Sequence, residues 1–147
     1  PRVREQEKSP RKVYAVDTGL AGAVGFRLGE DLGRLAENLV FNELQRRQGT
    51  NSDGEIFYWK DDQHREVDFL IREGGTVREL IQVCWSAAHP GTREREIRAL
   101  VRAMSDLGCT EALILSEEED GREEHAGKCL RFQPLCQWLL EEPAPNP

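Results

Sequence analysis

The order of hydrophobic patterns along the middle of the chain constrains its fold most. Apolar residues recur at helical spacing between Asp31 and Gly49, which predicts a first helix there. Three segments with the composition or alternation of β-strands follow, at residues 56–59, 66–71 and 77–85. A second amphipathic helix from Thr92 to Leu107 leads to a buried strand at 112–115. This order predicts an α/β sandwich with a central mixed sheet flanked by helices.

The flanking segments complete this assignment. We expect residues 1–11 to be a linker or cut edge, 12–140 to form one domain, and 141–147 to be a disordered tail. Within the domain we expect further short elements and an acidic loop: a strand at 12–16, a helix at 20–26, a loop at 117–124, a strand at 128–132 and a helix at 135–140. The segment 56–59 is expected to be buried on both faces of the sheet. Strict alternation would place Val67, Phe69 and Ile71 on one face.

Composition and charge exclude several classes of protein. The 147 residues are 38% hydrophobic and 32% charged, which suits one globular domain. No apolar run approaches the roughly 20 residues that cross a bilayer, so no membrane partner is expected. The net charge of −7 argues against indiscriminate binding of phosphate backbones. Because the chain begins with Pro1 and its single methionine is Met104, we expect it to be a fragment of a longer protein.

The cysteines and histidines give no metal-binding spacing. The four cysteines form no C-x-x-C pair, and the histidines lie in separate polar segments. Reduced thiols and a cytoplasmic location are therefore expected.

Polar residues of the predicted meander point to a site. If the hairpin loop comprises three residues, 74–76, Asp68 lies opposite Gln82 and Glu66 opposite Cys84, and the four share a face. A two-residue loop would shift this register by one. On the preceding helix, Glu37 lies at the border of the apolar stripe, where a carboxylate needs a partner.

Two interpretations of these acids remain open. Glu37 and Asp68 near one another would suit Mg²⁺, which is bound by one or two carboxylates and keeps waters or a substrate phosphate. Alternatively, Glu37 pairs with an arginine, and Asp68 caps or forms a salt bridge at a strand edge.

Several motifs in order carry a resemblance to a known family. These are KVYAVDTGL (12–20), DLGRLAENLVFNEL (31–44), REVDFLI (65–71), ELIQVCWS (79–86) and the following TREREIRAL. Over residues 12–116 the chain resembles the C-terminal domain of prokaryotic AAA-type ATPases. That domain is similar to restriction endonucleases of the PD-(D/E)XK superfamily, whose core is the α-βββ-α-β order described above. The resemblance implies an ATPase domain upstream, which would hold the ATP and act as a partner.

The resemblance also assigns site residues. Glu37 matches the helix acid, Asp68 the metal-binding aspartate, and Gln82-Val83-Cys84 the (D/E)-X-K positions. Cys84 departs from the pattern, because a neutral thiol cannot position an attacking water as an ammonium does. Lys60, at the end of the neighbouring strand, is a candidate to substitute for the missing lysine. Cys84 could alternatively act as a nucleophile, but neighbouring carboxylates raise a thiol pKa and so disfavour this role. We therefore expect Cys84 to be a packed, inert thiol.

Three functions follow as expectations. The first is a catalytically degenerate nuclease-like module that binds DNA or a protein partner. The second is an active Mg²⁺-dependent DNA endonuclease, and the third is a protein-interaction domain without a nucleic-acid role. Arginines on the helix at 92–107 alternate with Glu94 and Glu96, which favours a solvated face with ion pairs over a DNA-contacting face or an interface with the ATPase domain.

Overall fold

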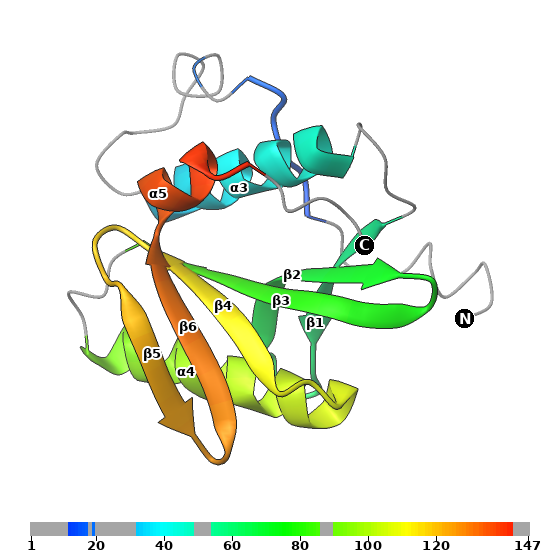
Figure 1. Ribbon diagram of the computed structural model, residues 1–147, viewed down its shortest axis with the longest axis vertical. Coiled ribbons are helices and arrows are strands. Elements are labelled where there is room, and N and C mark those ends of the chain that lie inside the picture. The colour runs from blue at the N-terminus through cyan, green and yellow to red at the C-terminus, as the bar shows by residue number, and fades with distance from the viewer. Residues whose placement is uncertain (1–11, 18, 20–31, 49–53, 86–89, 143–147) are drawn as a thin grey trace.

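A six-stranded sheet between helices makes up this mixed α/β fold (Figure 1). The computed structural model describes residues 12–17, 19, 32–48, 54–85 and 90–142. Within them, α3 (Leu32–Gln48) and α5 (Leu135–Leu140) cover one face of the sheet and α4 (Pro90–Leu107) covers the other. The predicted α/β class, with a central mixed sheet flanked by helices, is confirmed. None of the described helices is long and apolar enough to cross a bilayer.

The sheet has an antiparallel half and a parallel half. Its strands are β1 (Glu55–Lys60), β2 (Glu66–Glu73), β3 (Thr76–Cys84), β4 (Glu111–Ser116), β5 (Gly121–His125) and β6 (Lys128–Pro134). They lie in the order β1-β2-β3-β4-β6-β5. The first three pair antiparallel, β3 with β4 and β4 with β6 pair parallel, and β5 is antiparallel to β6. Helix α4 provides the crossover that a parallel pair requires between β3 and β4.

The β2–β3 hairpin differs from the predicted loop but keeps the predicted register. Gly74 and Gly75 form a two-residue turn with φ values of 55° and 85°, a conformation that glycine adopts without strain. The three-residue loop is therefore wrong. A bulge at Arg78 in β3 adds the missing residue, so that Phe69 still pairs with Ile81 as the three-residue loop would have required.

A second bulge interrupts β2. Phe57 pairs with Leu70 and Trp59 with Val67, so β2 has one residue more than β1 between these pairs. As a result, Val67 packs toward α4 and Phe69 toward α3. The predicted strict alternation, which placed both on one face, is wrong because the extra residue exchanges the faces of the strand.

Two apolar clusters hold the layers together. The cluster under α4 contains Leu80, Leu100, Met104 and Leu130, each fully buried. The cluster under α3 and α5 is centred on the fully buried Val40 and Ile81. Because β3 contributes neighbouring residues to both clusters, the two sides of the molecule share this central strand.

Three further expectations need correction. Strand β1 is not buried on both faces, because it lies at the sheet edge, where the Phe57 side chain is 43% exposed. Residues 12–16 are not a strand, because their backbone bonds to side chains of α3 instead of to the sheet. The second half of the acidic loop is strand β5, because a turn at Ala126-Gly127 with positive φ folds it onto β6.

Other expectations are confirmed or lie outside the described residues. The helices expected after Asp31, from Thr92 and at 135–140 are α3, α4 and α5. The strands expected in the meander, at 112–115 and at 128–132 are also present. The linker at 1–11, the helix at 20–26 and residues 143–147 of the tail lie outside the described residues.

Candidate functional site

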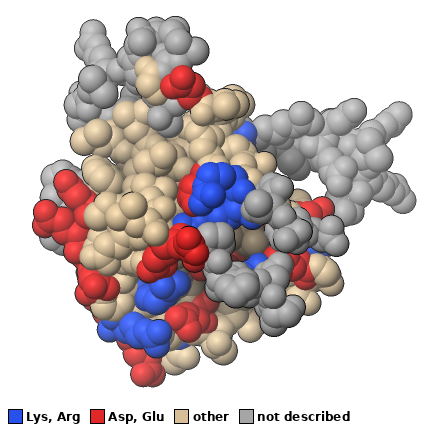
Figure 2. Space-filling model, turned by 45° about the horizontal axis from the view of Figure 1, so that its top comes forward, with Lys and Arg blue, Asp and Glu red and all other residues tan. Residues whose placement is uncertain are grey.

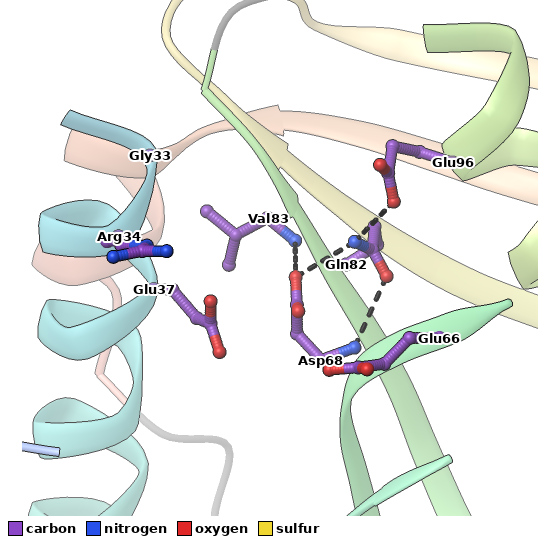
Figure 3. A pocket seen from close by; sticks show the side chains of 8 residues that line it. All are labelled: Gly33, Arg34, Glu37, Glu66, Asp68, Gln82, Val83 and Glu96. Carbon is purple, nitrogen blue, oxygen red and sulfur yellow. Dashed lines mark hydrogen bonds between the residues drawn. The ribbon is translucent and has the colours of Figure 1, made fainter. Parts of the chain in front are cut away.

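An acidic pocket of about 600 Å³ lies where α3 approaches β2 and β3 (Figure 3). Its lining comprises Gly33, Arg34 and Glu37 of α3, Glu66 and Asp68 of β2, Gln82 and Val83 of β3, and Glu96 of α4. Three of the predicted site residues, Glu37, Asp68 and Gln82, therefore meet in one pocket. Their convergence depends on the packing of α3 against the sheet, because Glu37 and Asp68 are far apart in sequence.

Asp68 is held rigidly at the bulge of β2. Its Oδ2 accepts hydrogen bonds from the Val83 N–H at 3.0 Å and from Gln82 Nε2 at 2.9 Å. In return, Gln82 Oε1 accepts a hydrogen bond from the Asp68 N–H at 3.2 Å. The predicted contact between Asp68 and Gln82 is thus made by side chains, beyond the last regular pair of the hairpin. The two bonds to Oδ2 fix the direction of the carboxylate, and the third holds the Asp68 backbone beside Gln82 at the bulge.

Lys12 supplies an ammonium group to the pocket, which the sequence did not predict. Its Nζ lies 2.9 Å from Glu37 Oε1, 2.9 Å from Asp68 Oδ1 and 2.7 Å from Glu66 Oε1. Glu37 therefore pairs with a lysine, where an arginine was considered above. One cation joins three carboxylates from two elements, so it offsets much of their mutual repulsion.

The segment that carries Lys12 docks on α3. The Asn38 side chain accepts a hydrogen bond from the Ala15 N–H at 2.7 Å and donates one to the Ala15 carbonyl at 2.8 Å. Tyr14 donates its hydroxyl to Glu37 Oε1 at 2.8 Å and stacks on Phe41, with ring centroids 4.1 Å apart. Residues 12–17, called the N-terminal arm below, are therefore positioned by helix side chains.

Burial and charge shift the protonation of the pocket. Burial, with the nearby Glu37 charge, raises the pKa of Asp68 to about 6, although Lys12 opposes the shift. Burial alone would lower the pKa of Lys12, but Asp68, Glu66 and Glu37 together raise it well above its ordinary value. Burial also raises the pKa of Tyr14, as does its bond to Glu37. Lys12 is therefore charged at neutral pH and Asp68 is close to titration.

Burial would raise the pKa of Glu66, but hydrogen bonds and charge from Lys12 and Lys60 outweigh burial and lower it. Lys60 is the lysine expected to substitute at the catalytic position. It lies 3.2 Å from Glu66 Oε2, whereas Lys12 lies 2.7 Å from Glu66 Oε1.

Cys84 packs away from the pocket. Its side chain is buried in the cluster under α4 and is not among the described residues that line the pocket. Burial raises its thiol pKa, and the nearby Glu96 charge adds to this. Cys84 therefore lies on the α4 side of β3, as Gln82 does, but it does not line the pocket with Glu66, Asp68 and Gln82.

The charges of α4 form ion pairs, as its sequence predicts. Arg95 Nη2 lies 2.8 Å from Glu96 Oε1, and Arg93 reaches Glu123 at 2.6 Å. Glu96 has a second contact, because its Oε2 accepts a hydrogen bond from Gln82 Nε2 at 2.8 Å (Figure 3). This bond ties α4 to the pocket from the side opposite α3.

The donor chemistry fits at most a hydrated divalent cation. Glu37 and Asp68 offer the carboxylate oxygens that Mg²⁺ prefers, and Mg²⁺ usually keeps several waters. Among the described residues, no group of three or more His, Cys, Asp or Glu side chains is arranged to hold a metal ion. Any such ion would also meet the Lys12 ammonium, which contacts both carboxylates.

Lys12, Tyr14, Arg34 and Glu96 are groups at the pocket that sequence reasoning missed. Lys12 and Tyr14 alternate with Val13, whose side chain is 92% exposed, so the polar side of the arm faces inward. That alternation was the available signal. From the local pattern alone, residues 12–16 were predicted to be a strand, and that pattern did not indicate that they dock on α3.

Comparisons with known proteins give one family match and one similar protein. The model of a family described as "Domain of unknown function (DUF4143)" matches residues 32–136. The chain is 43% identical over 98 residues to the uncharacterized protein MJ1544 of Methanocaldococcus jannaschii, a match that covers 65% of the chain. The match covers 20% of that relative, so the chain spans about a fifth of its length. No solved structure matches the chain.

Proposed function

The chain belongs to the DUF4143 family, and we propose that it is a nuclease-like domain that has lost catalysis and binds DNA or a protein partner. One observation carries this proposal. Asp68, Glu37 and Gln82 converge in a pocket, while the residue at the lysine position, Cys84, packs into the core. The pocket thus keeps the acids of a phosphodiester-cleaving site without its lysine in the usual place.

The element order supports the nuclease-like ancestry. Helix α3, the β1–β3 meander, α4 and β4 follow the α-βββ-α-β order of the PD-(D/E)XK superfamily that the motifs resemble. The acids occupy α3 and the middle strand of the meander, as that resemblance requires. We therefore propose a restriction-endonuclease-like topology.

The absence of a lysine at position 84 argues against efficient hydrolysis of a phosphodiester. A protonated thiol cannot stabilise negative charge that develops on a phosphate, and Cys84 is buried with a raised pKa. By analogy with the removal of one oxyanion donor, the cost is on the order of 10² to 10³ in rate.

The pocket itself is a poor receptor for phosphate. Four of its lining side chains are carboxylates, against Arg34 and the contacting Lys12. Figure 2 shows acidic and basic side chains interspersed on the visible face, without a continuous basic stripe. Binding of DNA would therefore require surface outside this pocket, whereas a protein partner needs no such basic surface.

The proposed context is an ATPase with this domain at its C-terminal end. It rests on the motif resemblance, and the 98-residue match covers only 20% of the relative, whose remaining length leaves room for a further domain. In this proposal ATP and its hydrolysis belong to that upstream domain, which is also a partner of the present one.

Incubation with DNA tests the proposal. The purified chain is mixed with plasmid and linear DNA in Mg²⁺ or Mn²⁺, and we expect no cleavage. Cleavage that Asp68→Ala abolishes, and that Asp62→Ala at an exposed turn residue leaves intact, would overturn it. Gel shifts at about 50 mM salt then distinguish the partners, because nucleic-acid binding is strongest at low salt.

One contact favours the second candidate, an active Mg²⁺-dependent endonuclease. The Lys12 ammonium lies 2.9 Å from Asp68 Oδ1, so a lysine from another segment reaches the acids after all. This candidate predicts DNA cleavage that is lost in both Asp68→Ala and Lys12→Gln. The same assay therefore separates the two functions.

A further inference from the structure

We propose that Lys12 is a tethered competitor for divalent cations, so that the acidic pocket accepts a cation only when the N-terminal arm leaves. The inference rests on the proposed nuclease-like function, because that function makes Glu37 and Asp68 the cation ligands. The pocket already holds a cationic group, since the Lys12 Nζ lies within 2.9 Å of both carboxylates. The ammonium therefore stands where an ion bridging these two acids would bind.

Competition follows from charge and space. A divalent ion held by Glu37 and Asp68 would compete with Lys12, which already donates a hydrogen bond to one oxygen of each carboxylate. The Lys12 side chain is only 21% exposed, so water screens its repulsion of a second cation weakly. Removal of Lys12 leaves Glu37, Glu66 and Asp68 without their shared counter-ion, which increases their attraction for a cation.

The attachment of the arm is separable from the fold. No residue of the arm pairs with a strand, and its backbone bonds to Asn38 and Asn42 of α3. Val13 and Val16 are 92% and 94% exposed, so they bury little apolar surface. Release of the arm withdraws Tyr14 from the edge of the cluster under α3, but the buried members of that cluster all lie on α3, α5 and the strands. It therefore opens the carboxylates without disrupting the sheet.

Tyr14 links the docking of the arm on α3 to the blocking of the pocket by Lys12. Its ring stacks on Phe41 of α3, and its hydroxyl donates to the same Glu37 oxygen that Lys12 contacts. When the arm leaves, Glu37 Oε1 loses both donors at once. Docking of the arm and blocking of the pocket are thus one event.

Binding of Mn²⁺, followed by electron paramagnetic resonance of the free ion, tests the inference without requiring activity. Lys12→Gln should bind Mn²⁺ at least about tenfold more tightly than the unaltered chain. Lys128→Gln, which removes the same charge from a lysine bonded to the Cys109 carbonyl, should change affinity less than about twofold. Adding Asp68→Asn to Lys12→Gln should abolish the gain.

A second variant keeps the test decisive if Lys12→Gln fails to fold. Asn38→Ala with Asn42→Ala removes the side chains that bond the backbone of the arm, so it should weaken docking while leaving every charge of the pocket in place. It should also increase Mn²⁺ affinity. Equal affinities for the unaltered chain and for folded variants, or no Mn²⁺ binding in any of them, would overturn the inference.

The two proposals fail separately. DNA cleavage by the unaltered chain contradicts the loss of catalysis, whatever the Mn²⁺ affinities are. Unchanged Mn²⁺ affinity in the arm variants contradicts the competition, even when no DNA is cut.

Discussion

At the scale of single residues, Asp68 determines how the pocket responds to pH. Its carboxylate is 12% exposed and accepts hydrogen bonds from Val83, Gln82 and Lys12, yet burial and Glu37 raise its pKa to about 6 from an ordinary 3.8. A group with a higher pKa in the folded protein adds stability at pH values below its unfolded pKa. That contribution is lost as pH rises through its folded pKa.

The first prediction concerns Asp68→Asn. Relative to this variant, the unaltered chain should lose stability as pH rises from about 4 to about 7, because only its Asp68 must ionise in the pocket. Urea unfolding across this range measures the difference in free energy of unfolding. Asp62→Asn, at an exposed residue, serves as the control. A difference between Asp68→Asn and the unaltered chain that is constant with pH would contradict the assignment.

Comparison with the variant is needed because Glu66 has the opposite effect. Its pKa is lowered, so its contribution to stability is lost as pH falls through the acid range. Both chains retain Glu66, so its effect cancels in the difference.

The second prediction ranks the thiols. Cys136 is exposed, whereas Cys84 is buried with a raised pKa, so a thiol reagent should modify Cys136 first and Cys84 last. Mass spectrometry of partly alkylated native protein shows the order. Fast labelling of Cys84 would instead revive its role as a nucleophile.

At the scale of elements, periodicity predicted the helices and most strands but not their irregularities. The apolar stripe of α4 and the strand-like composition of the meander are local patterns, readable without knowledge of neighbours. The bulges at Asp68 and Arg78 depend on how two strands pair. Strand β5 was hidden because Gly121–His125 is polar and pairs only at a sheet edge.

The same limit explains the site. Glu37, Asp68 and Gln82 were identified from strand register, helix position and family resemblance, and they meet in the pocket. Lys12 was missed because its role depends on the docking of the arm through Asn38. A segment held by side chains of a helix carries no periodic signal of its own.

The third prediction tests this docking. Asn38→Ala removes the acceptor of the Ala15 N–H, so amide exchange at Ala15 should accelerate about tenfold, the cost of one lost hydrogen bond. Nuclear magnetic resonance resolves this single amide. Asn42→Ala is the matched control, because Asn42 bonds only to carbonyls of the arm and leaves the amide protected. Equal exchange in all three chains would show that Asn38 does not anchor the arm.

At the scale of the whole molecule, the two clusters belong to one cooperative unit. Leu80 and Ile81, adjacent in β3, are both fully buried but point into opposite clusters. Loss of packing on one face therefore loosens the strand that supports the other.

The fourth prediction measures this coupling. Leu100→Ala empties a fully buried position under α4 and should lower the free energy of unfolding by about 2 to 5 kcal/mol. Fluorescence of Trp59, packed against that cluster, and of Trp138, in the opposite cluster, should report the same unfolding midpoint. Variants that lack Trp85 and keep only one of these two tryptophans separate the signals. Two distinct midpoints would mean that the faces unfold independently.

The extra residue in β2 makes the length of this stretch a constraint in its own right. A shortened strand would pair with β1 without interruption, so the residues on one side of the missing position would exchange core for solvent. Conservative replacements of Val67 or Phe69 preserve the facing of each side chain, whereas removal of either does not. Sequences that diverge from this one while keeping its architecture should therefore tolerate changes of residue type between Val67 and Leu70 far better than insertions or deletions.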